Sequence, residues 1–190
     1  MPLNIPNTLT WARIALIPFF VGIYYVPDHL MLPGDKNLIA TLTFVAAAVT
    51  DWFDGYLARS LGQTSAFGAF LDPVADKLMV AAALIVLVHL GRVDSLIALV
   101  IIGREITISA LREWMAKVGA AGSVAVAFVG KLKTAAQMSA IPLLLIQAPV
   151  LGMDSMVLGT VLIYVAAVLT LWSMGYYMRC AWPELMKRSR

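Results

Sequence analysis

Residues 51–76, DWFDGYLARSLGQTSAFGAFLDPVAD, place four aspartates and one arginine inside a chain whose residues are 61% hydrophobic. On insertion scales a carboxylate in a bilayer costs about 2.5–3.5 kcal/mol, so ionisable groups inside membrane segments usually mark functional sites. We therefore interpret this stretch as the functional centre around which the rest of the chain is organised.

The spacing of the aspartates assigns them to two helix faces. Asp51 and Asp54 are three residues apart, and Asp72 and Asp76 are four apart, so each pair lies on one face of its helix. Four carboxylates would repel one another without a cation. Oxygen ligands suit Mg²⁺ or Mn²⁺, and paired metals commonly assist displacement at phosphorus. The stretch contains neither His nor Cys, which argues against zinc.

The composition indicates a membrane protein. Only 13% of the 190 residues are charged, against about one quarter in soluble domains. We expect an all-α, polytopic membrane protein, in which residues 1–190 form a single domain of six transmembrane helices. The lone Cys180 excludes an intrachain disulfide. The net charge of +3 fits contact with anionic lipid headgroups better than nucleic acid.

Apolar runs and turn residues predict where the helices lie. A short interfacial segment over residues 1–10 is expected to lead into the first span. The spans are expected over residues 9–26, 38–59, from the Asp72-Pro73 pair to 90, from 96 onward, 124–146 and 156–178. We expect Asp72-Pro73 to start or kink a helix. Arg13 is interpreted most simply as an interface anchor, and alternatively as a ligand of substrate phosphate.

The basic residues predict the orientation in the membrane. Six spans would put both termini on one side, and only Lys36 and Arg92 would fall on the other, leaving 12 of the 14 basic residues with the termini. Basic residues concentrate on the cytoplasmic side. The termini and the aspartates are therefore expected to face the cytoplasm.

The pattern D-x2-D-G-x2-A-R-x8-G-x3-D-x3-D marks the CDP-alcohol phosphotransferases, and this chain resembles that family at every fixed position. The matching residues are Asp51, Asp54, Gly55, Ala58, Arg59, Gly68, Asp72 and Asp76. The resemblance implies that the four aspartates bind metal, two Mg²⁺ ions or alternatively Mn²⁺, and that Asp76 is also the general base. It further implies that Gly55, Ala58 and Gly68 let a CDP nucleotide approach, that Arg59 faces its phosphates, and that the protein is a homodimer.

A second group of charged residues bears on the acceptor alcohol. Arg104, Arg112, Lys131 and Lys133 would lie on the same membrane side as the aspartates. Guanidinium and ammonium groups suit phosphate oxygens, which favours an acceptor that carries its own phosphate. The alternative is that these residues are only anchors at the membrane surface.

The stretches NIPNTLTWAR, IGREITISALREW and GKLKTAAQ are similar to the branch of the family whose acceptor is glycerol 3-phosphate. This resemblance implies transfer of a phosphatidyl group from CDP-diacylglycerol to glycerol 3-phosphate, with release of CMP, in the bacterial inner membrane. Other branches would use phosphatidylglycerol or inositol phosphate. A divalent-cation transporter is the alternative from another class, but it would need polar groups continuing to the far side of the spans.

Overall fold

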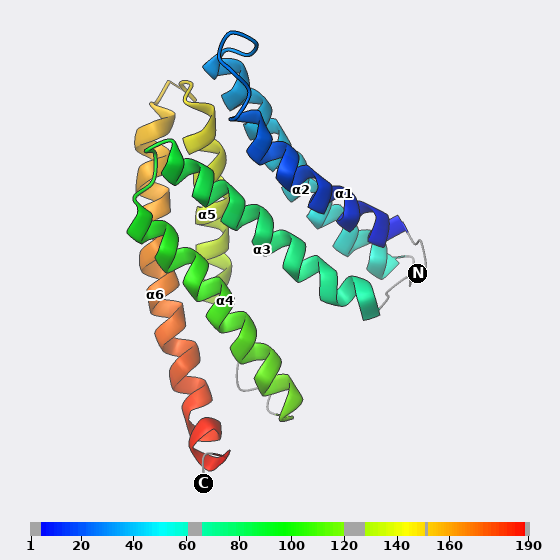
Figure 1. The fold of residues 1–190 in the computed structure, drawn as a ribbon. Helices are drawn as coiled ribbons and strands as arrows, with labels where there is room; N and C mark the ends of the chain where they lie inside the picture. Colours follow the sequence, from blue (N-terminus) through cyan, green and yellow to red (C-terminus); the bar gives the residue numbers. More distant parts are fainter. Residues whose placement is uncertain (1–4, 61–65, 120–127, 151, 189–190) are drawn as a thin grey trace.

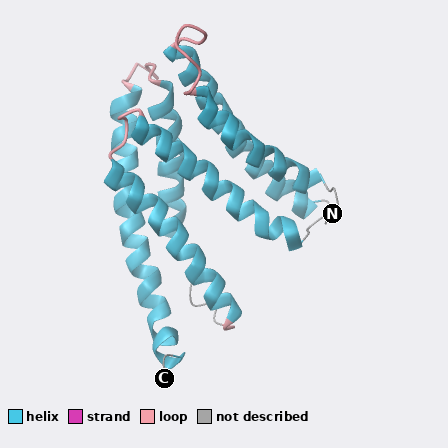
Figure 2. Cartoon of the chain, viewed as in Figure 1, coloured by secondary structure: helices cyan, strands magenta, loops and turns pink. Residues whose placement is uncertain are grey.

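The computed structural model describes residues 5–60, 66–119, 128–150 and 152–188, and these residues form a bundle of six helices (Figure 1). The helices are α1 (Ile5–Ile23), α2 (Pro33–Ser60), α3 (Ala66–His89), α4 (Ser95–Lys117), α5 (Phe128–Ile146) and α6 (Ser155–Arg188). Helices and loops account for all the secondary structure coloured in Figure 2. The prediction of an all-α protein is confirmed.

Consecutive helices run in alternating directions. The connections after α1, α3 and α5 gather at one end of the bundle, at the top of Figure 1. The start of α1, the ends of α2 and α4 and the end of α6 point to the other end. Because the aspartate motif lies where α2 ends and α3 begins, it belongs to the end that also holds the start of α1.

The helices pack around α3, which contacts α1, α2, α4 and α5. α6 lies outside, against α4 and α5. The α5 and α6 backbones come close at Gly159, where a Cβ atom would lie 2.8 Å from the side chain of Leu144. The apolar core takes Phe44, Leu84 and Ile141, among others, from the helix halves near the three loops. A second, smaller apolar cluster lies in the opposite halves of α4 and α6, which share that end of the bundle with the charged residues; it consists of Ile108, Met115, Tyr177 and Ala181.

Arg92, in the turn between α3 and α4, contacts α2 and α5 at the end of the bundle that holds the connections after α1, α3 and α5. Its guanidinium donates to the backbone carbonyls of Leu144 and Leu145, at 3.1 and 2.8 Å, and to Oδ1 of Asn37 at 2.8 Å. The last carbonyls of a helix have no partner within the helix, so Arg92 satisfies two of them at the end of α5 while it also holds α2.

Several helix ends differ from the sequence predictions. α1 begins at Ile5, so much of the expected lead-in is already helical, and α2 begins at Pro33, because proline is tolerated in a first turn. α3 begins at Ala66 and continues through Pro73, so Asp72-Pro73 does not start the helix. α6 extends to Arg188, beyond the predicted end at residue 178.

Among the described residues, one stretch is long and apolar enough to cross a membrane, Ser155–Pro183 in α6. The apolar part of α1, Thr8–Ile23, is shorter. α2, α3, α4 and α5 carry the charged residues discussed above, which interrupt their apolar character. The helical bundle is therefore consistent with a membrane protein, and the number of spans stays a prediction.

Candidate active site

The first part of the site joins α1 to the aspartates of α2 and α3. Arg13 donates from Nη1 to Oδ1 of Asp51 at 2.7 Å, and its side chain is only 2% exposed. One turn earlier on α1, the hydroxyl of Thr10 donates to Oδ1 of Asp72 at 2.5 Å. Because Arg13 is buried against a carboxylate, the interpretation of this residue as an interface anchor is wrong.

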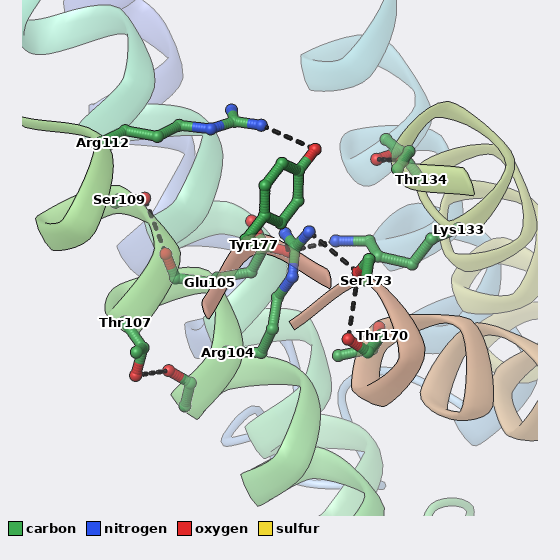
Figure 3. A network of polar contacts seen from close by, with 12 residues as sticks. Arg104, Glu105, Thr107, Ser109, Arg112, Lys133, Thr134, Thr170, Ser173 and Tyr177 are labelled. Atoms are coloured by element: carbon green, nitrogen blue, oxygen red, sulfur yellow. Dashed lines mark hydrogen bonds and ion pairs between the residues drawn. The ribbon is translucent and has the colours of Figure 1, made fainter. Parts of the chain in front are cut away.

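The second part of the site is a charged group on α4 and α5 (Figure 3). Glu105 accepts from Nη1 of Arg104 at 3.0 Å and from Nζ of Lys133. The side chains of Arg104 and Lys133 are 8% and 3% exposed, whereas that of Glu105 is 23% exposed. Two nearly buried cations thus share one carboxylate, which partly offsets the cost of removing them from water.

α6 supports this charged group from behind. Arg104 donates from Nη2 to the hydroxyl of Ser173 at 3.1 Å, and Ser173 in turn donates to the carbonyl of Thr170. The buried ring of Tyr177 lies 5.6 Å from the Arg104 guanidinium and 5.0 Å from that of Arg112. Arg112 also donates to the Tyr177 hydroxyl at 3.0 Å (Figure 3). Tyr177 therefore holds two arginines that lie two helical turns apart on α4.

A cavity of about 160 Å³ joins the two parts of the site. It receives Asp51 from α2, Asp76 from α3, Glu105 from α4, and Lys133 and Gln137 from α5; Lys77, Val80, Thr134 and Met138 complete its lining. Two carboxylates of the motif, those of Asp51 and Asp76, thus face the same space as the ammonium of Lys133. Since drug-sized ligands usually occupy about 300–1,000 Å³, this cavity suits a small polar molecule.

An apolar groove of about 280 Å³ lies next to the cavity, between α2 and α5. Phe44, Ala48 and Met138 line the groove and also a much smaller cavity that reaches Arg13 and Asp76. Met138 lines the larger cavity as well. The same three side chains therefore border both the apolar groove and the small cavity beside Asp76.

The structure brings together some of the predicted site residues and separates others. Arg104, Arg112 and Lys133 form one group through Glu105 and Tyr177. Lys131 does not join them, because two residues along a helix turn its exposed side chain away from the buried Lys133. Gly68 is buried in the first turn of α3. Asp54, Gly55, Ala58 and Arg59 lie on α2, but only their backbone belongs to the described part of the structure.

The donor atoms at this site have the chemistry that a hard divalent cation requires. Asp51, Asp72 and Asp76 offer carboxylate oxygens, the ligands preferred by Mg²⁺ and Mn²⁺. Within the side chains that the structure describes, no three acidic, His or Cys residues lie close enough together to hold an ion. Asp54, the remaining carboxylate of the motif, is not among those side chains. The residue types fit the metal, and the metal site stays a prediction.

Sequence reasoning assigned no role to several residues that the structure places here. Glu105 is one of them, although a carboxylate beside an arginine in an apolar segment is itself a signal. Gln137 follows Lys133 by four residues, so the two share a face of α5. Thr10, Ser173 and Tyr177 are common residue types in apolar helices, and nothing in their spacing distinguishes them.

The chain belongs to the CDP-alcohol phosphatidyltransferase family, whose model matches residues 3–172. Its relatives include a protein of Yersinia enterocolitica that is 49% identical over 98% of this chain and the whole of the relative. Proteins of Pectobacterium atrosepticum and Sodalis glossinidius are each 50% identical over the same shares. All three carry the name CDP-diacylglycerol–glycerol-3-phosphate 3-phosphatidyltransferase.

Proposed function

We propose that this protein transfers the phosphatidyl group of CDP-diacylglycerol to glycerol 3-phosphate, giving phosphatidylglycerophosphate and CMP. The names of relatives about 50% identical over nearly the whole chain support this reaction. The observation that carries the proposal is the cavity that Asp51 and Asp76 share with Lys133 and Glu105. It offers carboxylates for the chemistry and a cation for an acceptor phosphate in one space.

The reaction is a displacement at phosphorus. The primary hydroxyl oxygen of glycerol 3-phosphate attacks the phosphorus that carries the diacylglycerol, and its proton passes to a carboxylate oxygen of Asp76. The bond between that phosphorus and the oxygen shared with CMP breaks, and CMP leaves with the electron pair. Asp76 suits the role of base because it lines the same cavity as Lys133.

Asp51, Asp54, Asp72 and Asp76 are the residues that would hold two Mg²⁺ ions, with Mn²⁺ as an alternative. When bound, such ions would neutralise charge on the pyrophosphate and on the departing CMP. The chain's own contribution is to orient the carboxylates, since Thr10 holds Asp72 and Arg13 holds Asp51.

The donor substrate would lie along α2 and the start of α3. Gly55, Ala58 and Gly68 would leave room for the CDP nucleotide, and Arg59 would face its phosphates. The apolar groove between α2 and α5 suits one acyl chain of the diacylglycerol, because Phe44, Ala48 and Met138 border both the groove and the small cavity beside Asp76.

Arg104, Arg112 and Lys133 are the residues that we assign to the phosphate of the acceptor. These three cations and Glu105 together carry two net positive charges. A phosphate monoester carries about 1.5–2 negative charges at neutral pH, so the charges of the acceptor and the site are complementary. Lys131 was predicted together with these residues but is exposed, so it serves as the comparison for the buried Lys133.

We further propose that all six helices cross the bacterial inner membrane, with both termini and the active site on the cytoplasmic side, and that the protein is a homodimer. Large apolar side chains exposed on the bundle support contact with lipid, among them Val161, Val168 and Trp172 on α6. The test uses an impermeant maleimide applied from outside and single cysteines in a Cys180→Ser background. The cysteine of His29→Cys should be labelled, and the cysteine of Lys117→Cys should not. Equal labelling of both would contradict this orientation.

The reaction is tested by CMP release from CDP-diacylglycerol with purified protein in detergent and Mg²⁺. Glycerol 3-phosphate, glycerol, inositol phosphate and phosphatidylglycerol serve as alternative acceptors. We expect release with glycerol 3-phosphate alone. Release with another acceptor would preserve the chemistry and refute the specificity, and no release from folded protein with any acceptor would refute the enzymatic function.

A further inference from the structure

We propose that the side-chain amide of Gln137 binds the secondary hydroxyl of the acceptor. It would thereby make the site selective for a phosphate ester with a hydroxyl on the carbon next to the one that bears the attacking hydroxyl. This inference rests on the proposed reaction and deepens it. The basic group explains how a phosphate is held, and Asp76 explains how the attacking hydroxyl loses its proton. Neither explains recognition of the carbon between them.

Gln137 lines the same cavity as the groups that serve these two functions. It lies on α5 one turn after Lys133 and on the same face, and it lines the cavity together with Asp76 and Glu105. Its side chain is among the buried polar ones, with 4% of the residue exposed. An acceptor molecule that spans from Lys133 to Asp76 would therefore pass alongside the Gln137 amide.

The amide oxygen of Gln137 is buried and is left unpaired by the described residues. A buried acceptor without a partner costs free energy that a ligand hydroxyl would recover. A hydroxyl both donates and accepts, so it can pair with either end of an amide.

Several other polar side chains of the cavity are already engaged within the protein. Glu105 accepts from Arg104 and Lys133, and the hydroxyl of Thr134 donates to the carbonyl of Gly130 at 3.0 Å. Asp51 accepts from Arg13. Gln137 is thus the neutral side chain of this cavity best suited to a neutral hydroxyl.

The test compares glycerol 3-phosphate with 3-hydroxypropyl phosphate, which keeps the phosphate and the primary hydroxyl but lacks the secondary one. For the wild-type protein we expect kcat/KM to be about 10- to 100-fold higher with glycerol 3-phosphate. In Gln137→Leu and Gln137→Met this ratio should fall to within about threefold of unity, through loss of activity on glycerol 3-phosphate alone. KM for CDP-diacylglycerol should not change.

Ser139→Ala is the matched control, because Ser139 is exposed on another face of α5 and does not line the cavity; it should keep the wild-type ratio. A wild-type ratio near unity would overturn the proposal without any variant. Equal loss on both acceptors in folded Gln137 variants would also overturn it, since that pattern belongs to a structural role. If the wild-type protein were inactive on both acceptors but folded, the proposed reaction itself would fail.

Discussion

Replacing Glu105 by Gln should weaken the fold and strengthen binding of the acceptor. Glu105 is the shared anion between Arg104 and Lys133 (Figure 3). Glutamine has nearly the same shape and can still accept one hydrogen bond, but it removes the negative charge. Two nearly buried cations then face each other without a counter-charge.

The loss of stability can be worked out from burial. Breaking a fully buried ion pair by removing one partner costs about 3–5 kcal/mol. Glu105 is 23% exposed, so solvent screening reduces the cost to about 2–3 kcal/mol. For a chain of 150–250 residues, about 1 kcal/mol corresponds to about 2–4 °C in Tm. We therefore expect Tm to fall by about 4–12 °C.

Binding of the acceptor should change in the opposite direction. Removing Glu105 raises the net charge of the group from two to three positive charges. One further charge acting over about 8 Å, with an effective dielectric constant of about 20–40, contributes about 1–2 kcal/mol. KM for glycerol 3-phosphate should then fall about 5- to 30-fold.

The measurements are thermal unfolding in detergent and CMP release at varied glycerol 3-phosphate. Glu113→Gln is the matched control, since Glu113 is an exposed residue of the same helix paired with Lys117 at 2.8 Å. It should change neither Tm nor KM measurably. The reasoning is refuted if Glu105→Gln has the Tm of this control, or if its KM rises.

Three further predictions concern the proposed roles. Lys133→Ala should raise KM for glycerol 3-phosphate at least 30-fold, and Lys131→Ala less than threefold, because only Lys133 is buried in the site. Similar increases in KM for the two variants would contradict the assignment. Tyr177→Phe removes the hydroxyl that Arg112 contacts but keeps the ring, so we expect KM to rise about 3- to 10-fold with kcat unchanged. A fall in kcat alone would argue against positioning by Tyr177. Asp76→Asn should abolish CMP release while CDP-diacylglycerol still binds. The control Asp94→Asn, at the exposed N-cap of α4, should remain active. Normal turnover in Asp76→Asn would show that Asp76 is not the base.

Helix ends were harder to predict than helix existence. Pro33 and Pro73 illustrate the reason: proline is a local signal for a boundary, yet one stands in a first turn and the other lies inside α3. Pro33 loses no hydrogen bond, because a first-turn N–H has no partner within the helix. At Pro73, packing of the rest of α3 outweighs the loss of one backbone hydrogen bond. The extension of α6 to Arg188 is likewise not evident from the apolar run, which ends earlier.

The sequence by itself determined the fold class, the family and the chemical character of the site. Long apolar runs predict membrane helices, because a helix satisfies its backbone hydrogen bonds internally. The spacing of the aspartates determines which of them share a helix face, since that depends only on helical geometry.

Only the tertiary structure decided which charges meet. Arg13 and Asp51 are 38 positions apart, and Lys133 and Glu105 are 28 apart, so no local period relates them. The packing of α1 on α2 and α3, and of α3 on α4 and α5, brings these residues to one place. The same packing excludes Lys131 and includes Gln137, because burial depends on which face of α5 meets its neighbours.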